Sequence, residues 1–135
     1  MSKKTVLLVD DDSDFVEQNR TVLEEGGYTV DVAFNGDECR KYVEDKEPDL
    51  IVLDVMLPSM DGFQVCQILK HNTLYKDIPI IMLSAKIKKE DINKGLQQGA
   101  DDYMTKPFDP NQLTDRIKAF ISRSSSGQKN VGGNK

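Results

Sequence analysis

Four polar groups in this chain could carry chemistry, and each lies at or just after the end of a short apolar run. The acidic triplet 10–12 follows VLLV, Asp54 closes LIVLD, Ser84 closes PIIMLS, and Lys106 follows DYMT. Carboxylates held close together repel one another, and a hard divalent cation such as Mg²⁺ relieves that repulsion. A metal, an ammonium and a hydroxyl would together bind phosphoryl oxygens, which leaves Asp54 as a carboxylate nucleophile able to form an acyl phosphate.

Five strand–helix units must position these groups. Apolar runs predict strands, and apolar residues at helical spacing predict a helix after each strand. Several strands have no polar face, as is typical of a parallel sheet covered by helices on both sides, and the carboxyl ends of such strands meet at one edge. The predicted elements, in chain order, are strand 5–10, helix 13–25, strand 28–34, helix 36–45, strand 50–54, helix 60–72, strand 79–84, helix 89–98, strand 102–105 and helix 109–122.

Taken singly, each of these groups has an ordinary explanation. The acids at 10–12 and Asp14 could be solvated residues at a helix N-terminus, and Lys106 could be a turn lysine. Their convergence at the ends of four strands favours a functional site instead. His71, near the end of a helix, is interpreted as a surface residue, whereas Tyr103 fits both core packing and a switch.

Composition limits the class of protein. The chain has 135 residues, 38% of them hydrophobic and 30% charged, which fits one soluble globular domain. The net charge of −5 argues against general nucleic-acid binding. The sequence shows no signal peptide and no run of roughly 20 apolar residues for a membrane span. Cys39 and Cys66 are interpreted as reduced thiols of a cytoplasmic protein. Residues 1–122 are predicted to form the domain, and the Ser- and Gly-rich stretch 123–135 a flexible tail or linker.

Four motifs in order resemble the receiver domain of bacterial two-component response regulators, of the kind found in chemotaxis regulators. The resemblance covers about Lys4–Arg123. It implies a flavodoxin-like (βα)5 fold with strand order 2-1-3-4-5. The motifs are VLLVDDD (6–12), LIVLDVMLPSMDG (50–62), IIMLSAK (80–86) and GADDYMTKPF (99–108).

The resemblance also implies how a phosphoryl group would be accepted. Asp54 would be the phosphoacceptor, Lys106 would pair with the phosphoryl oxygens, and Pro107 would hold the lysine's loop. Mg²⁺ would be held by Asp10, Asp11 and Asp54, with the backbone carbonyl of Met56 as a further ligand.

The resemblance also implies switching roles for two more side chains. Ser84 would contact the phosphoryl group, and Tyr103 would turn inward as Ser84 moves. The implied donor is a histidine kinase or a histidine phosphotransfer protein. The chain would catalyse its own Mg²⁺-dependent phosphorylation and slow dephosphorylation without turning over a separate substrate. An alternative is that it forms the N-terminal receiver of a larger regulator with a DNA-binding or enzymatic output domain.

Two rival functions are disfavoured by particular residues. A phosphatase of the haloacid-dehalogenase type usually carries a second acid two residues after its nucleophile, and Met56 stands there. A flavodoxin-like nucleotide or flavin binder needs a first loop that offers N–H groups to phosphate, and the triplet 10–12 would repel the ligand instead.

Lifetime and assembly give two further expectations. Dephosphorylation needs a positioned water, and the residues best placed to control it, Met56 and Lys86, offer no general base near pH 7. We therefore expect a long-lived phosphorylated form. In receivers that dimerise through their last two helices and last strand, acids like Asp101 and Asp102 pair with arginines like those at 116 and 123. Departures elsewhere on that surface favour a monomer, with at most a weak phosphorylation-dependent dimer; these are Ile92, Asn93, Gln112 and Thr114.

Overall fold

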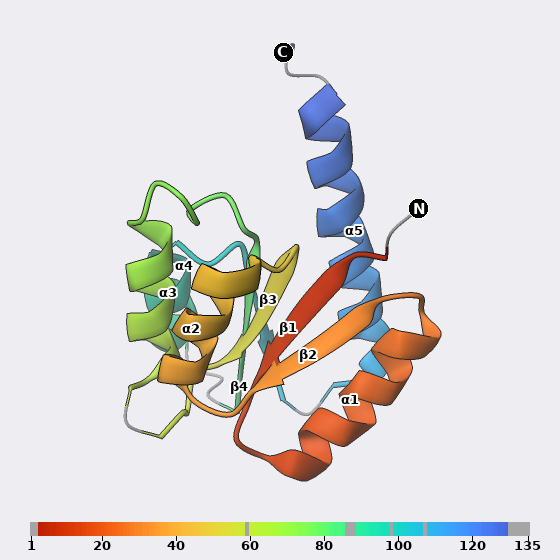
Figure 1. Cartoon of the computed structure of the whole chain (residues 1–135). Helices are drawn as coiled ribbons and strands as arrows, with labels where there is room; N and C mark the ends of the chain where they lie inside the picture. The colour runs from red at the N-terminus through yellow and green to blue at the C-terminus, as the bar shows by residue number, and fades with distance from the viewer. Residues whose placement is uncertain (1–2, 59, 86–88, 98, 107, 130–135) are drawn as a thin grey trace.

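Five parallel strands and five helices alternate along the part of the chain that the structure describes (Figure 1). The computed structural model describes residues 3–58, 60–85, 89–97, 99–106 and 108–129, with side chains up to residue 122. The elements are β1 (Thr5–Val9), α1 (Ser13–Glu25), β2 (Thr29–Ala33), α2 (Gly36–Lys46), β3 (Leu50–Asp54), α3 (Gly62–Lys70), β4 (Ile80–Ser84), α4 (Lys89–Gln97), β5 (Asp102–Thr105) and α5 (Pro110–Lys129).

The strand order is β2-β1-β3-β4-β5, and every neighbouring pair is parallel, so the predicted topology is confirmed. Helices α1 and α5 cover one face of the sheet, and α2, α3 and α4 cover the other (Figure 1). Successive residues of one strand point to opposite faces: Leu7 packs in the core under α2 and α3, and Leu8 packs under α1 and α5. Both faces of the sheet are therefore buried, which explains why the strands are continuous apolar runs.

Local capping signals set several helix ends as the sequence predicts. The Asn35 side chain accepts a hydrogen bond from the Glu38 N–H at the start of α2. Asp109 accepts one from the Asn111 N–H, and Pro110 is the first residue of α5. Helix α1 ends at Glu25 with Gly26 as its C-cap, and the following Gly27 has a φ of 99°, a conformation that residues with a side chain disfavour.

The last helix is longer than predicted. We expected it to end at Ser122, with a flexible stretch from residue 123, but α5 continues to Lys129. The segment after Ser122 contains no proline, and a helix already started by packing extends with little further cost per residue. The last residues of the predicted tail, 130–135, lie outside the described part of the chain.

Across the ranges described above, no helix combines the length and apolar character needed to cross a bilayer.

Candidate functional site

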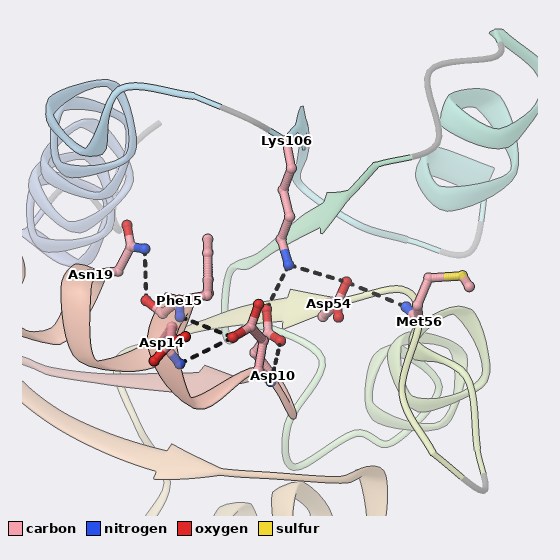
Figure 2. A network of polar contacts seen from close by, with 8 residues as sticks. Asp10, Asp14, Phe15, Asn19, Asp54, Met56 and Lys106 are labelled. Carbon is pink, nitrogen blue, oxygen red and sulfur yellow. Dashed lines mark hydrogen bonds and ion pairs between the residues drawn. The ribbon is translucent and has the colours of Figure 1, made fainter.

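The carboxyl ends of the central strands bring the predicted site residues together. Asp10 directly follows β1, Asp54 ends β3, Ser84 ends β4 and Lys106 directly follows β5. The parallel register places Asp54 opposite Leu83, one residue before Ser84. Figure 2 shows Lys106 reaching from the loop after β5 toward the two carboxylates. Residues far apart in sequence thus share one crevice, as the strand-end argument predicts.

Asp10 is buried and strongly held. Its side chain is almost without exposed surface, and its Oδ1 accepts a hydrogen bond of 3.0 Å from the Asp12 N–H. Its Oδ2 lies 2.7 Å from the Lys106 Nζ. A buried carboxylate is costly unless it is paired and hydrogen-bonded, and Asp10 is both.

Asp54 is also buried, but its negative charge is less completely balanced by partners than that of Asp10. Lys106 Nζ lies 3.8 Å from its Oδ1, which also accepts a 3.3 Å hydrogen bond from the Met56 N–H. Burial and the neighbouring Asp10 raise the pKa of Asp54 to about 6, although Lys106 and the Met56 N–H oppose that rise. Additional positive charge near Asp54 would therefore stabilise its ionised, nucleophilic form.

Three carboxylates form a cluster with the chemistry of a hard-cation site. One oxygen each from Asp10, Asp11 and Asp54 lie within 4.8 Å of one another. Two of these acids are buried and Asp11 is exposed, so the cluster opens to solvent on one side. An all-oxygen set with an open side fits Mg²⁺, which keeps several waters when a protein binds it. The donor set therefore fits the expected metal.

Ser84 and Tyr103 are joined on the other side of the crevice. Ser84 is fully buried at the end of β4, and its hydroxyl shares a side-chain hydrogen bond with that of Tyr103. Burial raises the pKa of Tyr103. The Tyr103 ring packs against α4, where a Cβ on Gly95 would lie 2.9 Å from ring atom Cδ2. The tyrosine is thus turned inward, between β5 and α4.

Other predicted residues are placed as follows. Met56 has its backbone beside Asp54, and its side chain is 59% exposed at the mouth of the crevice. A cavity of about 430 Å³ opens there, between the loop after β3 and α4. Lys86 and Pro107 lie outside the described residues.

Acids of the α4–β5–α5 surface form ion pairs within the chain, and the pairing expected between two copies in a dimer stays a prediction. Asp102 does pair with Arg116, within the chain and through both carboxylate oxygens, at 2.7 and 2.8 Å. Asp101 pairs with Lys70, at 2.8 Å, and the side chain of Arg123 lies outside the described residues. Thr114, which we expected on this surface, is buried on the side of α5 that faces the end of α1, near Gly26. That position is set by the helix periodicity of α5, which buries Leu113 and Ile117 against the sheet.

Two residues at the site had no role in the sequence interpretation. Phe15 lies beside the Lys106 ammonium, and Gly95 makes room for Tyr103. A glycine inside a predicted helix costs about 1 kcal/mol relative to alanine, so Gly95 carried a readable signal of close packing. Phe15 carried none, because an aromatic residue in a helix is ordinary core material.

Comparison with known proteins decides the family. The family model described as the response regulator receiver domain matches residues 6–118. This chain belongs to the response regulator receiver domain family. Two solved receivers superpose closely: the receiver domain of Francisella response regulator 1452 (35% identity, TM-score 0.85, covering 90% of this chain and 99% of that one) and a CheY-like receiver domain protein from Methanospirillum hungatei (30% identity, TM-score 0.85, covering 93% and 98%).

Two curated relatives of this receiver domain are named as transcriptional regulatory proteins. The alkaline phosphatase synthesis transcriptional regulatory protein PhoP of Bacillus subtilis is 48% identical over 92% of this chain and 50% of its own length. The phosphate regulon transcriptional regulatory protein PhoB of Pseudomonas aeruginosa is 43% identical over 94% and 56%. The chain thus spans about half the length of these relatives. Another relative, RpaA of Synechocystis, is named as DNA-binding, and the expectation of no nucleic-acid contact by this chain stays a prediction.

Proposed function

We propose that this receiver domain accepts a phosphoryl group on Asp54 from a phosphohistidine of a histidine kinase or a histidine phosphotransfer protein. The observation that carries the proposal is the buried Asp54 carboxylate, which faces the Lys106 ammonium at 3.8 Å within a cluster of three acids. An Asp54 oxygen would attack phosphorus as the histidine N–P bond breaks, and the released imidazole nitrogen would take up a proton. Lys106 would pair with the phosphoryl oxygens.

Asp10, Asp11 and Asp54, with the Met56 backbone carbonyl, would hold the Mg²⁺ ion. When bound, Mg²⁺ supplies positive charge that offsets both the carboxylates and the transferred group. The ion would bind only the assembled site, so millimolar Mg²⁺ should raise the melting temperature. Asp11→Ala should reduce that rise strongly, because it removes one of the proposed ligands. Asp11 is exposed, so its loss should disturb the fold itself little. An equal rise in both proteins would contradict the proposed ligand set.

Phosphorylation would act through the joined pair of Ser84 and Tyr103. Ser84 would exchange its hydrogen bond with Tyr103 for one to the phosphoryl group, and this would bias the packing of Tyr103 against α4. The output surface is therefore expected around β5 and α4. A monomer that dimerises weakly, and only when phosphorylated, remains our expectation for assembly, and residues 1–122 our expectation for the extent of the domain.

The direct test is intact-mass measurement after incubation with acetyl phosphate and Mg²⁺. The unsubstituted chain should gain one acid-labile phosphoryl group and Asp54→Asn none, whereas the control Asp14→Asn, an exposed acid of α1, should behave like the unsubstituted chain. Uptake by Asp54→Asn would show that another residue is the acceptor. Steady hydrolysis of phosphate esters would favour the phosphatase class instead.

The lifetime of the phosphorylated form gives a second test. Met56 offers no strong hydrogen-bond partner to an attacking water, and Lys86 can donate to a water but cannot take its proton. The double variant Met56→Asn, Lys86→Glu should therefore dephosphorylate faster at fixed Mg²⁺. An unchanged rate would place the control of lifetime elsewhere.

A further inference from the structure

The Lys106 ammonium rests on an aromatic ring as well as on carboxylates. Its Nζ lies 4.1 Å from the centroid of the Phe15 ring, which is within the range of a close cation–π contact. The same Nζ lies 2.7 Å from Asp10 and 3.8 Å from Asp54. Figure 2 shows the Phe15 ring standing beside the end of the lysine side chain. The ammonium thus has carboxylates at one side and a ring at another.

Residue 15 is held through its backbone by α1, and its ring is held by a second ring. The Phe15 N–H donates to the carboxylate of Asp12, the N-cap of α1, and the Phe15 carbonyl accepts from the Asn19 side-chain amide one turn later. Its ring meets the Phe108 ring edge to face, with centroids 5.9 Å apart. Phe108 lies two residues after Lys106, so the ring stack ties the start of α1 to the loop that carries the lysine.

We propose that Phe15 is a positioning residue that holds the Lys106 ammonium at the acceptor site through its ring face. This inference rests on the proposed function, because it assigns Phe15 a part in the phosphorylation of Asp54. A free lysine side chain samples many rotamers, and ordering it opposes the reaction. The ring restricts that freedom without neutralising the ammonium or using one of its hydrogen bonds.

A ring differs from a further carboxylate because it holds the lysine without neutralising its charge. A third acid at position 15 would hold the lysine equally well, but it would compete with the transferred phosphoryl group for the same positive charge. A leucine at position 15 would fill similar space and would offer the ammonium only apolar surface, which disfavours a charge. The ring therefore leaves the lysine's charge available where negative charge develops.

The sharpest test changes the electrons of the ring and keeps its shape. Phenylalanine with one, two or three ring fluorines is placed at position 15, and the rate of Asp54 phosphorylation by phosphoramidate and Mg²⁺ is measured. Because a small donor needs no docking surface on α1, the rate reports on the site alone. We expect a stepwise fall to roughly one tenth of the original rate with three fluorines, a size typical of a partly desolvated cation–π contact. Phe15→Leu should fall at least as far.

The matched control is the same fluorine series at Phe120, a partly buried ring of α5 in the core under α1 and α5, which should leave the rate unchanged. A phosphorylation rate that does not change with fluorination at position 15, or that falls equally at both positions, would overturn the inference. Neither result would contradict the phosphorylation of Asp54 itself.

A second measurement does not depend on phosphorylation. In the NMR spectrum the Lys106 ε-methylene protons should be shifted upfield by the ring and return to ordinary values in Phe15→Leu. Ordinary values in the unsubstituted chain would overturn the inference even if no phosphoryl transfer occurred. Failure of the proposed function alone would appear instead as no phosphoryl gain with the upfield shift intact.

Discussion

The β3–α3 and β4–α4 units follow the same plan but are anchored very differently. Both helices span nine residues, and both follow a strand that ends in a site residue, Asp54 or Ser84. Helix α4 buries only Gly95. Helix α3 begins in a capping box and buries five residues, Gly62, Phe63, Val65, Cys66 and Leu69.

The close approach at the start of α3 strengthens this contrast. A Cβ at Gly62 would collide with the Asp54 carbonyl oxygen, so the first turn of α3 lies directly on the strand end that carries Asp54. A segment with many buried apolar contacts is locally more stable than one with few. The elements that move in a switch come from the less stable parts of a protein. The β3–α3 unit therefore holds Asp54 in place, whereas the weakly anchored β4–α4 unit suits the response that we propose for Ser84 and Tyr103.

The largest expected difference between the units comes from one leucine in each helix. Leu69 of α3 is buried, and Leu96 of α4 is 45% exposed. Leu69→Ala should lower the free energy of unfolding by about 3 kcal/mol, because it leaves a cavity in the core. Leu96→Ala should lower it by less than about 1 kcal/mol. Urea unfolding of both variants measures this, and similar losses would show that α4 is anchored as firmly as α3.

The end of α3 is anchored by a lysine, and its removal should have the next largest effect. Lys70 Nζ donates to the carbonyls of Lys76 and Ile78 and to the carboxylate of Asp101, with its side chain only 12% exposed. Lys70→Met should cost about 2–3 kcal/mol, because it leaves those acceptors without their buried donor.

The exposed pair of Arg116 and Asp102 is the control for this prediction. The Arg116 side chain is 45% exposed, so Arg116→Met should cost less than about 1 kcal/mol despite its two short hydrogen bonds. If the two substitutions cost the same, Lys70 is not an anchor of α3.

Part of the contrast between the two units is readable in the sequence, because residues 62–70 hold five apolar side chains and residues 89–97 hold two. Strands β3 and β5 have the predicted bounds, because the spacing of apolar residues and the turn residues that flank them are local signals in the sequence. Gathering of Asp10, Asp54 and Lys106 at one edge follows from parallel topology. The pairing of Lys70 with Asp101 and the contact of Phe15 with Lys106 join residues 31 and 91 positions apart, and only the folded geometry selects such partners.

The charge at the end of β3 predicts a stabilising substitution. The pKa of Asp54 is raised to about 6 in the folded protein, above its ordinary value of 3.8, so the folded state binds this proton more tightly than the unfolded state. The contribution of protonated Asp54 to the free energy of unfolding is therefore fully present below about pH 4, and it is lost as the pH rises through about 6. In metal-free buffer, Asp54→Asn should therefore raise the free energy of unfolding by about 2 kcal/mol at pH 8 and by much less at pH 4. A gain that is equal at both pH values would show that the charge of Asp54 is not its cause.

The smallest expected effect concerns the packing of Tyr103 on α4, and a double-mutant cycle isolates it. Alanine at position 95 should favour the helix by about 1 kcal/mol, but its Cβ would lie 2.9 Å from a Tyr103 ring atom and 3.2 Å from Phe63 Cε1. In the chain with Tyr103 intact, Gly95→Ala should therefore gain nothing or destabilise. In a Tyr103→Ala background the main obstacle is gone, and Gly95→Ala should stabilise.

The two results should differ by about 1 kcal/mol, the coupling expected of residues in direct contact. The same cycle followed by NMR should show Gly95→Ala moving the Tyr103 ring resonances, because the ring must leave α4 and its hydrogen bond to Ser84. Leu96→Ala is the control: it changes a neighbouring, exposed side chain of α4 and should leave those resonances in place. A coupling near zero would mean that α4 yields to the new Cβ instead of expelling the tyrosine. Helix α4 would then be the part that moves most easily, and Tyr103 the part that stays.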